Sequence, residues 1–308
     1  MIVAILGAGP AGMSCANACL SFGLKPVVIE RGDHLGGAQR GNFHPNLWML
    51  GFPGETGEIM TERLATHYRD LAVPTHYRAE LTQVSRGGGG FRLSLRDDDG
   101  PRVLEARAIV IATGTRPRAT PPLERFAAEC PRAIIGPLSN SIRDDIRDTD
   151  VLILGGGDNA LDHALFLAER GNRAVVCTRA AFSARRPFIA TCRDRADIDL
   201  RDHCPAPGLS HENGRVIARW PHERRVFDWL LVMYGYVPNT DVLDRFEAAI
   251  RPAITANGYL QVDAWQRCDV PGLYAAGDVT DTPQPSVPTA MAQGLVAARA
   301  VERDLTAS

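Results

Sequence analysis

The feature that most constrains the fold is a glycine-rich segment that occurs twice in the 308-residue chain. The copies VAILGAGPAGMSCA (residues 3–16) and VLILGGGDNALDHA (residues 151–164) each begin as an apolar run, break into closely spaced glycines and resume with helix-forming residues. A buried strand, a tight glycine turn and a helix are typical of the unit that binds a dinucleotide phosphate in a parallel sheet. The sequence therefore predicts two such units.

The first turn, GAGPAG at residues 7–12, has the G-x-G-x-x-G spacing that a pyrophosphate requires. In this motif Gly7 makes the tight turn, Gly9 lets the pyrophosphate approach the backbone, and Gly12 lets the helix pack close to its strand. Glu30 closes the next apolar run, where a carboxylate accepts hydrogen bonds from ribose hydroxyls. The expected elements are a strand at residues 2–6, a helix at 13–22 and a strand at 26–29. We predict a dinucleotide site here.

The second turn, GGGDNA at residues 155–160, has the related spacing G-x-G-x-x-A, formed by Gly155, Gly157 and Ala160. We expect a strand at 151–154, a helix at 161–170 and a strand at 173–177. The last strand ends in Cys177-Thr178-Arg179 and has no carboxylate. An acid would repel the 2′-phosphate of NADP, whereas Arg179, helped by Arg185 or Arg186, could bind it. The sequence favours NADPH over NADH, while a turn that binds no nucleotide remains an alternative.

Composition limits the other functions. A chain of this length with 45% hydrophobic residues is expected to form two domains. The formal net charge of −2 offers no basic field for nucleic acid. No segment approaches the roughly 18 consecutive apolar residues of a membrane span. The seven cysteines show no close pairing, and the histidines have no metal-ligand spacing. We expect a cytoplasmic protein without a metal site.

Two further segments end in tight turns. AIVIATG (residues 108–114) and LYAAGD (residues 273–278) are buried-strand patterns followed by glycine. Asp278, directly after Gly277, is suited to accept hydrogen bonds from sugar-alcohol hydroxyls. The helix expected at residues 288–301 would point its first amides, near Thr289, at an electron-rich group.

In this order the motifs resemble the low-molecular-weight thioredoxin-reductase-like flavoproteins, whose FAD domain is split around an inserted NADPH domain. The resemblance implies an α/β fold of two Rossmann-like dinucleotide-binding domains of the three-layer ββα type. The domains would span residues 1–117 and 243–308 for FAD and 118–242 for NADPH. It also implies a homodimer.

The resemblance assigns roles to particular residues. GGAQ (residues 36–39), with Gly37 and Gln39, resembles the GGQ segment beside the flavin. Gly114 belongs to the ATG turn at the domain crossover, and YGYVPNT (residues 234–240) is similar to the return crossover. The remaining residues implied to contact FAD or its ribityl chain are Gly7, Gly9, Gly12, Glu30, Gly277, Asp278 and Thr289.

The chain departs from that family in its cysteines. Thioredoxin reductases carry a C-x-x-C pair before the second glycine turn, but residues 133–142 here read AIIGPLSNSI, and no C-x-x-C occurs anywhere. A dithiol relay needs two neighbouring sulfurs, so reduction of thioredoxin by the usual route is not supported. Cys192 and Cys204 are the other inserted-domain pair, and we expect both to be packing residues.

The NADPH segment also departs from the family pattern. Cys177-Thr178-Arg179 replaces His-Arg-Arg, and Ser183 replaces a later arginine. GFPG at residues 51–54 looks more like the thioredoxin-reductase-type ferredoxin reductases. Residues 188–221 are poorly patterned and rich in charge and proline, and there we expect partner or substrate specificity.

Three functions follow from these patterns. The first is an FAD-dependent oxidoreductase that passes hydride from NADPH to a small molecule, a quinone or an electron carrier without a dithiol. The second is an FAD oxidase that acts on an organic or thiol substrate with oxygen as acceptor and does not use the NADPH site. The third is a non-catalytic flavin-bound sensor or assembly protein. No catalytic acid or base is predicted, because flavin chemistry resides in the cofactor.

Overall fold

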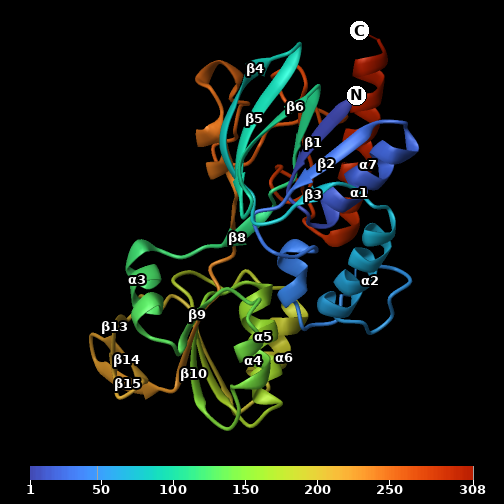
Figure 1. The fold of residues 1–308 in the computed structure, drawn as a ribbon. Helices are drawn as coiled ribbons and strands as arrows, with labels where there is room; N and C mark the ends of the chain where they lie inside the picture. The colour runs from blue at the N-terminus through green and yellow to red at the C-terminus, as the bar shows by residue number, and fades with distance from the viewer. Residues whose placement is uncertain (47, 308) are drawn as a thin grey trace. The chain divides into compact units, whose positions relative to one another are not determined.

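The chain, described by a computed structural model over residues 1–46 and 48–307, divides into two compact units. The first unit comprises Met1–Arg116 and Pro238–Ser308, and the second comprises Pro117–Val237. The chain leaves and re-enters the first unit through two short paired strands, β8 (Thr115–Pro117) and β17 (Tyr236–Pro238) (Figure 1).

The first unit is built on a five-stranded parallel sheet in the order β18-β7-β1-β2-β3. Its strands are β1 (Ile2–Leu6), β2 (Lys25–Ile29), β3 (Thr75–His76), β7 (Ala108–Ile111) and β18 (Leu273–Ala275). The strand β1 is at the centre and is apolar throughout, because a parallel strand is covered on both faces.

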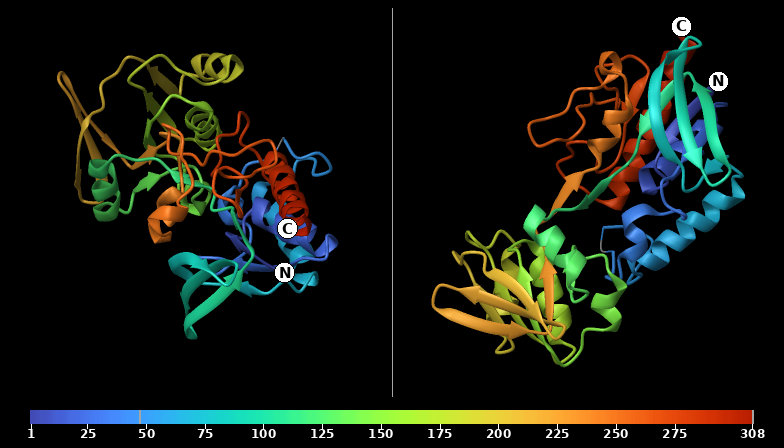
Figure 2. Two further views of the ribbon diagram at one scale, coloured as in Figure 1. Left: turned by 90° about the horizontal axis from the view of Figure 1, so that it is seen from above. Right: turned by 60° about the vertical axis from the view of Figure 1, so that its left-hand side comes forward.

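Two different layers cover this sheet. On one face lie the helices α1 (Pro10–Ser21), α2 (Gly57–Asp70) and α7 (Val287–Thr306). On the other lies an antiparallel sheet of β4 (Glu80–Gly87), β5 (Gly90–Asp97) and β6 (Gly100–Ala106), drawn in cyan to green in Figure 2. Alternate residues of β1 reach the two layers: Val3 and Ile5 pack on the helices, Ala4 and Leu6 on the antiparallel strands. This is the three-layer arrangement that the resemblance predicts.

The remaining elements of the first unit are short. They are the 3-10 helices η1 (Gly37–Gly41), η2 (Thr240–Arg245) and η3 (Ala248–Ile250). The helices α1 and α7 approach closely because Gly294 lacks a side chain: a Cβ there would lie 2.2 Å from the Ala11 carbonyl oxygen. This contact places the start of α7 near the first glycine turn.

The second unit repeats the parallel sheet, in the order β12-β11-β10-β16-β9. Its strands are β9 (Ala133–Ile135), β10 (Asp150–Leu154), β11 (Arg173–Cys177), β12 (Ile198–Arg201) and β16 (Trp229–Val232). Its helices are α3 (Pro121–Glu129), α4 (Asn140–Asp144), α5 (Asp158–Ala168) and α6 (Arg186–Arg193). A three-stranded antiparallel sheet of β13 (Gly208–Glu212), β14 (Arg215–Trp220) and β15 (Glu223–Phe227) packs beside it.

The two sequence repeats occupy equivalent places. The strand β1 lies between β2 and β7, and β10 lies between β11 and β16. The prediction of two Rossmann-like sheets, one inserted within the other, is confirmed. Among the described residues no helix combines the length and apolar character needed to span a membrane.

Two details differ from the sequence predictions. The helices α1 and α5 begin inside their glycine turns, at Pro10 and Asp158, because proline and acidic residues are favourable in the first helical turn. The segment 188–221, expected to lack regular pattern, instead supplies part of α6 and the strands β12 to β14. Among its charged residues, Arg201 at the end of β12 pairs with Asp199 of the same strand and with Glu223 of β15.

Candidate functional site

The first glycine turn is closed to side chains at two positions and open at the third. Gly7 has a φ of +106°, and a Cβ there would lie 2.5 Å from the Ala112 carbonyl oxygen. A Cβ on Gly12 would lie 1.9 Å from the Gly7 oxygen, so the helix packs directly on the turn. A Cβ on Gly9 would meet no atom within 4 Å. The open space lies at the start of α1, which no side chain caps and where anions bind favourably.

Glu30 lies at the end of β2 and is fixed to this turn. Its carboxylate accepts hydrogen bonds from the amides of Ala8, at 2.7 Å, and Gly32, at 2.6 Å. A carboxylate has about four lone-pair positions, so both oxygens retain acceptor capacity for a sugar hydroxyl. The structure therefore holds the predicted ribose-binding group in place through backbone amides.

The segment that carries Gly37 lies against the same turn. Gly36 and Gly37 both have positive φ, and a Cβ on Gly37 would lie 3.2 Å from the Cα of Gly9. Gln39, in η1, accepts a hydrogen bond from the side-chain amide of Asn42 at 3.0 Å. The segment thus borders the open space beside Gly9.

Asp278 follows β18 at the carboxyl edge of the sheet. The turn before it needs glycine, because Gly277 has a φ of +81°. The Gly277 amide donates to Oε1 of Gln293 at 2.8 Å. Burial raises the pKa of the Asp278 carboxyl, and no described residue donates a hydrogen bond to it. A half-buried acceptor without a donor among the described residues can accept from a ligand or from water.

Thr289 begins the long helix α7 in the same unit. Ser286 caps this helix: its hydroxyl oxygen accepts from the Thr289 amide at 3.3 Å and contacts the Thr289 hydroxyl at 2.8 Å. The sequence analysis missed Gln293, although its position one helical turn after Thr289 places it on the same face.

Gly114 lies where the chain leaves the first unit. Its φ is +64°, and its carbonyl oxygen accepts from the Asn239 amide at 2.9 Å. The side-chain amide of Asn239 donates to the Thr113 carbonyl at 2.8 Å, and the Thr113 hydroxyl donates to the Asn239 carbonyl at 3.0 Å. The outgoing and returning segments are therefore tied together by reciprocal bonds. Asn239 occurs in the predicted return crossover, but its bonding was not foreseen.

The second glycine turn has the same steric pattern. A Cβ on Gly155 would lie 2.2 Å from the Met233 carbonyl oxygen, and one on Gly156 would lie 2.7 Å from Oγ1 of Thr178. The nearest atom to a Cβ on Gly157 would be the Ser183 hydroxyl, at 3.9 Å. Ala160 is fully buried and takes the position where the first turn has its third glycine. The backbone at Gly157 is therefore as approachable as at Gly9.

A cavity of about 340 Å³ lies at this turn, outside the carboxyl ends of the strands. The glycine turn, the end of β11, the loop at 204–206 and residues 233–235 line it. A second cavity of about 520 Å³ shares Arg179, Ala206 and Tyr234 with the first. Ligands of open α/β sheets bind at such strand ends. Tyr234 and Ala206 were not predicted, because they come from segments distant in the sequence.

The two predicted arginines differ in their surroundings. Arg179 is exposed and lines both cavities, and no residue of the described chain forms an ion pair or hydrogen bond with its guanidinium. Arg185 bonds Asp158 twice, through its backbone amide and its Nε, both at 2.7 Å. Its guanidinium also stacks over Phe188, 4.5 Å from the ring centroid, and it is not among the lining residues. Arg179 is therefore a cation at the cavity without a carboxylate partner among the described residues.

The cysteines named from the sequence are not neighbours of each other. Cys192 is fully buried; its thiol contacts the Leu161 carbonyl oxygen at 3.7 Å, and burial raises its pKa to about 11. Cys204 is half-buried and lines the cavity together with Cys177, whose pKa is raised by burial and then by the nearby Cys204. The expected packing role fits Cys192 but does not describe Cys204.

Residues 1–294 match the family model described as pyridine nucleotide-disulphide oxidoreductase. The chain belongs to this family. The protein is thus an FAD-dependent, NADPH-linked oxidoreductase, and the predicted resemblance and both cofactors are confirmed.

Several known proteins are similar to the chain. A ferredoxin–NADP reductase of Limosilactobacillus fermentum is 29% identical over 291 residues, covering 90% of this chain and 84% of that protein. One of Paramagnetospirillum magneticum is 28% identical over 305 residues, covering 91% and 85%. The thioredoxin reductase structure of Lactococcus lactis superimposes with a TM-score of 0.81 at 21% identity, covering 99% of both chains. At that identity the structural likeness establishes the fold alone.

Proposed function

We propose that this oxidoreductase binds NADPH at the second glycine turn and FAD at the first, and passes electrons from the flavin directly to a small electron carrier or quinone. The observation that carries the proposal is the cavity beside Gly155 and Gly157 with Arg179 at its wall. An unpaired arginine beside an approachable glycine turn is complementary to a phosphorylated dinucleotide.

The residues of the first unit fit FAD. The open backbone at Gly9 and the uncapped start of α1 would receive the diphosphate, and Glu30 would accept from the ribose. Asp278, a half-buried acceptor without a described donor, would accept from ribityl hydroxyls. Gly37 and Thr289 would border the isoalloxazine. When bound, FAD supplies the hydride chemistry, and the protein positions it and tunes its electrostatics.

The end of β11 supports NADPH over NADH. A guanidinium forms paired hydrogen bonds to a phosphate, and no carboxylate of the described residues pairs with Arg179. Arg185 neutralises Asp158, an acid at the start of α5 that would otherwise repel a phosphate there. In this proposal Arg179 binds the 2′-phosphate, and Arg185 neutralises the charge of Asp158 without contacting the phosphate itself.

The absence of a C-x-x-C pair limits which electron acceptor we propose. Without a C-x-x-C pair, no dithiol of the thioredoxin-reductase type can take electrons from the flavin. The similar proteins of L. fermentum and P. magneticum are named as ferredoxin–NADP reductases, which supports a small redox protein as acceptor. A quinone or another small molecule is the remaining choice.

One observation favours a second candidate, the FAD oxidase. Of the two predicted arginines, Arg185 is engaged with Asp158, and Ser183 stands beside Gly157 where related proteins have an arginine. If Arg179 alone cannot hold NADPH, an organic substrate would reduce the flavin and oxygen would accept the electrons.

Anaerobic flavin reduction tests the proposal. We expect NADPH to bleach the flavin rapidly and NADH to do so poorly. Arg179→Ala should reduce NADPH efficiency about ten- to a hundredfold, since a charge-assisted contact contributes roughly 1.5–3 kcal/mol, and leave NADH nearly unchanged. The control is Arg193→Ala, which removes an equal charge from an exposed site outside the cavity.

The outcomes separate the candidates. Equal losses for both nucleotides in Arg179→Ala would assign Arg179 a structural role. No bleaching of the wild type by either nucleotide would favour the oxidase. Reoxidation of the reduced protein by ferredoxin, a quinone or thioredoxin, followed by the return of flavin absorbance, then identifies the acceptor class.

A further inference from the structure

Two thiols meet at the wall of the cavity in the second unit. Cys177 ends β11, and Cys204 lies in the loop that follows the neighbouring strand β12. The parallel pairing places Cys177 opposite Arg201, and the Cys204 amide donates to the Thr178 carbonyl at 2.9 Å. The two cysteines line the same cavity, and after burial Cys204 is the group that most raises the pKa of Cys177.

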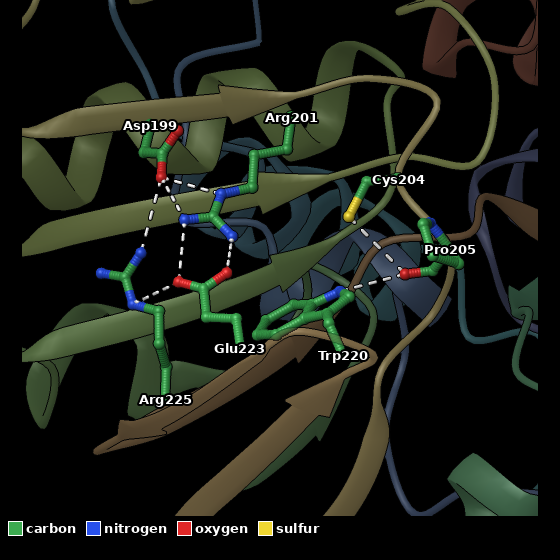
Figure 3. Close-up of polar contacts among 7 residues, drawn as sticks. All are labelled: Asp199, Arg201, Cys204, Pro205, Trp220, Glu223 and Arg225. Carbon is green, nitrogen blue, oxygen red and sulfur yellow. Dashed lines mark hydrogen bonds and ion pairs between the residues drawn. The ribbon is translucent and has the colours of Figure 1, made fainter.

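The loop that carries Cys204 is held in place. The Cys204 thiol contacts the Pro205 carbonyl oxygen at 3.6 Å, and the Trp220 indole donates to the same oxygen at 3.1 Å (Figure 3). Just before the loop, Arg201 bonds Glu223 at 2.5 Å and Asp199 at 2.8 Å. Figure 3 shows this ion-pair network next to the loop. The proximity of the thiols is therefore built into the strand pairing and these contacts.

The two thiols differ in access. Cys177 is 3% exposed, and burial, followed by the nearby Cys204, raises its pKa to about 12. Cys204 is half-buried and faces the cavity. A solute that enters the cavity meets Cys204 first, with Cys177 behind it as a resolving thiol.

We propose that Cys177 and Cys204 form a reversible disulfide when a hydroperoxide enters the cavity, and that this disulfide lowers the affinity for NADPH. The Cys204 thiolate attacks the peroxide, the O–O bond breaks, and a sulfenic acid and an alcohol, or water, are released. The Cys177 sulfur then displaces the sulfenic oxygen as water and forms the S–S bond. The two thiols together lose two electrons and two protons, and the hydroperoxide is reduced.

The effect on NADPH rests on the proposed function. A disulfide holds its sulfurs about 2.05 Å apart, closer than two unbonded thiols can lie. Its formation draws the loop of Cys204 and Ala206 toward the end of β11, where Arg179 follows two residues after Cys177. The cavity wall and the proposed phosphate contact change together.

The disulfide is tested on the full-length flavoprotein treated with hydrogen peroxide, by mass spectrometry of its peptides without reduction. We expect a cross-linked peptide pair containing Cys177 and Cys204, absent from Cys177→Ser and Cys204→Ser. Cys192→Ser, which removes another buried thiol of the same unit outside the cavity, should retain it. Recovery of Cys204 as sulfinic acid without the cross-link would overturn the proposal. Cys204→Ala is a second variant without this thiol, and it should also lack the cross-linked peptide pair, so the test does not depend on whether the serine variant folds.

The effect on the cavity is tested by calorimetric titration with adenosine 2′,5′-bisphosphate, which carries the 2′-phosphate but cannot reduce the flavin. Oxidised wild type should bind about tenfold more weakly than reduced wild type, the loss expected for one broken charge-assisted contact, and thiol reductant should restore binding. Cys204→Ser should show no change on oxidation. A cross-linked protein with unchanged affinity would overturn the regulatory half. Reduced protein that fails to bind would overturn the NADPH site instead, while the mapped cross-link would stand.

Discussion

At the scale of single residues, glycine positions were predictable because their cause is local. A G-x-G-x-x-G spacing fixes where the backbone turns, and the structure excludes a Cβ at Gly7, Gly12 and Gly155. The arginines were less predictable. Whether Arg179 or Arg185 is available for a phosphate depends on Asp158, which the fold brings next to Arg185 from a position 27 residues away in the sequence.

Gly9→Val tests the first turn. The position has a φ of −74°, which valine can adopt, and a Cβ there meets no atom of the protein within 4 Å. It would instead fill the space proposed for the FAD diphosphate. We expect a folded protein with a melting temperature close to that of the wild-type apoprotein, but without stoichiometric FAD in its absorption spectrum. A yellow Gly9→Val protein with full flavin content would show that the diphosphate lies elsewhere.

Asp278→Asn separates ligand binding from folding. Burial raises the pKa of this carboxyl, so the ionised form is less favourable in the folded apoprotein than in the unfolded chain. The associated stability is present at low pH and is lost as the pH rises through the raised pKa. Asparagine removes this cost, and the apo variant should be at least as stable as the wild type at pH 7.

The same variant should bind FAD more weakly. The variant loses charge-assisted hydrogen bonds to the FAD hydroxyls, which contribute roughly 1.5–3 kcal/mol. We therefore expect its FAD affinity to fall about ten- to a hundredfold. Fluorescence titration of the apoprotein with FAD measures this, and urea unfolding at pH 5 and pH 8 measures stability. A variant that loses stability but keeps its FAD affinity would assign Asp278 to the fold.

At the scale of elements, strands and helices of the two repeats were predictable from hydrophobic runs and glycine punctuation. The strands β1 and β11 have the predicted bounds, Ile2–Leu6 and Arg173–Cys177. The strands β12 to β15 were not recognised, because charged residues interrupt their apolar pattern. In the fold such charges form ion pairs between strands, as Arg201 of β12 does with Glu223 of β15. An interrupted apolar pattern is therefore compatible with a strand at the edge of a sheet.

The helix α7 depends on an ion pair near its end. Asp304 accepts two bonds from Arg267 and one from the Tyr274 hydroxyl, each at 2.7 Å, which fixes the helix to β18. The bonds from Arg267 lower the pKa of Asp304 below its ordinary 3.8. The stability from this ionised group is therefore complete above about pH 5 and is lost as the pH falls below the ordinary value.

Asp304→Asn should lower the free energy of unfolding at pH 7 by about 1–2 kcal/mol, less than for a fully buried pair because the side chains are about one-third exposed. The difference from the wild type should shrink as the pH falls toward 3. Urea unfolding across that range measures it. Glu302→Gln, in the same helix, is the control: Glu302 contacts the exposed Arg299 at 3.2 Å, longer than the bonds of Asp304, and the change should alter stability by less than about 0.5 kcal/mol. A difference independent of pH would mean that the charge is not responsible.

At the scale of the whole molecule, the duplication of the glycine turn predicted the duplication of the sheet. The extents of the units were harder to predict. The sequence places the inserted domain at 118–242, whereas the second unit spans Pro117–Val237. The reason is that residues between 238 and 242 contact the first unit: Asn239 bonds Thr113, and Val242 packs against the core of that unit, contacts that are invisible in local sequence. Homodimerisation and cytoplasmic location stay predictions from the sequence.

The independence of the second unit is the last prediction. Its parallel sheet β12-β11-β10-β16-β9 is complete within residues 117–237, and its core cluster draws only on that segment. The segment 1–116 alone lacks β18 and α7, so one edge of its sheet and much of its helical layer would be missing.

We therefore expect a fragment of residues 117–237 to unfold cooperatively on heating, without flavin, and to bind adenosine 2′,5′-bisphosphate. A fragment of residues 1–116 should show no cooperative transition and no FAD binding, because exposed strand edges and apolar faces favour aggregation over folding. Circular dichroism and flavin absorbance measure both. If the second fragment fails to fold, or if residues 1–116 fold alone and hold FAD, the division of the chain into one split and one inserted domain is wrong.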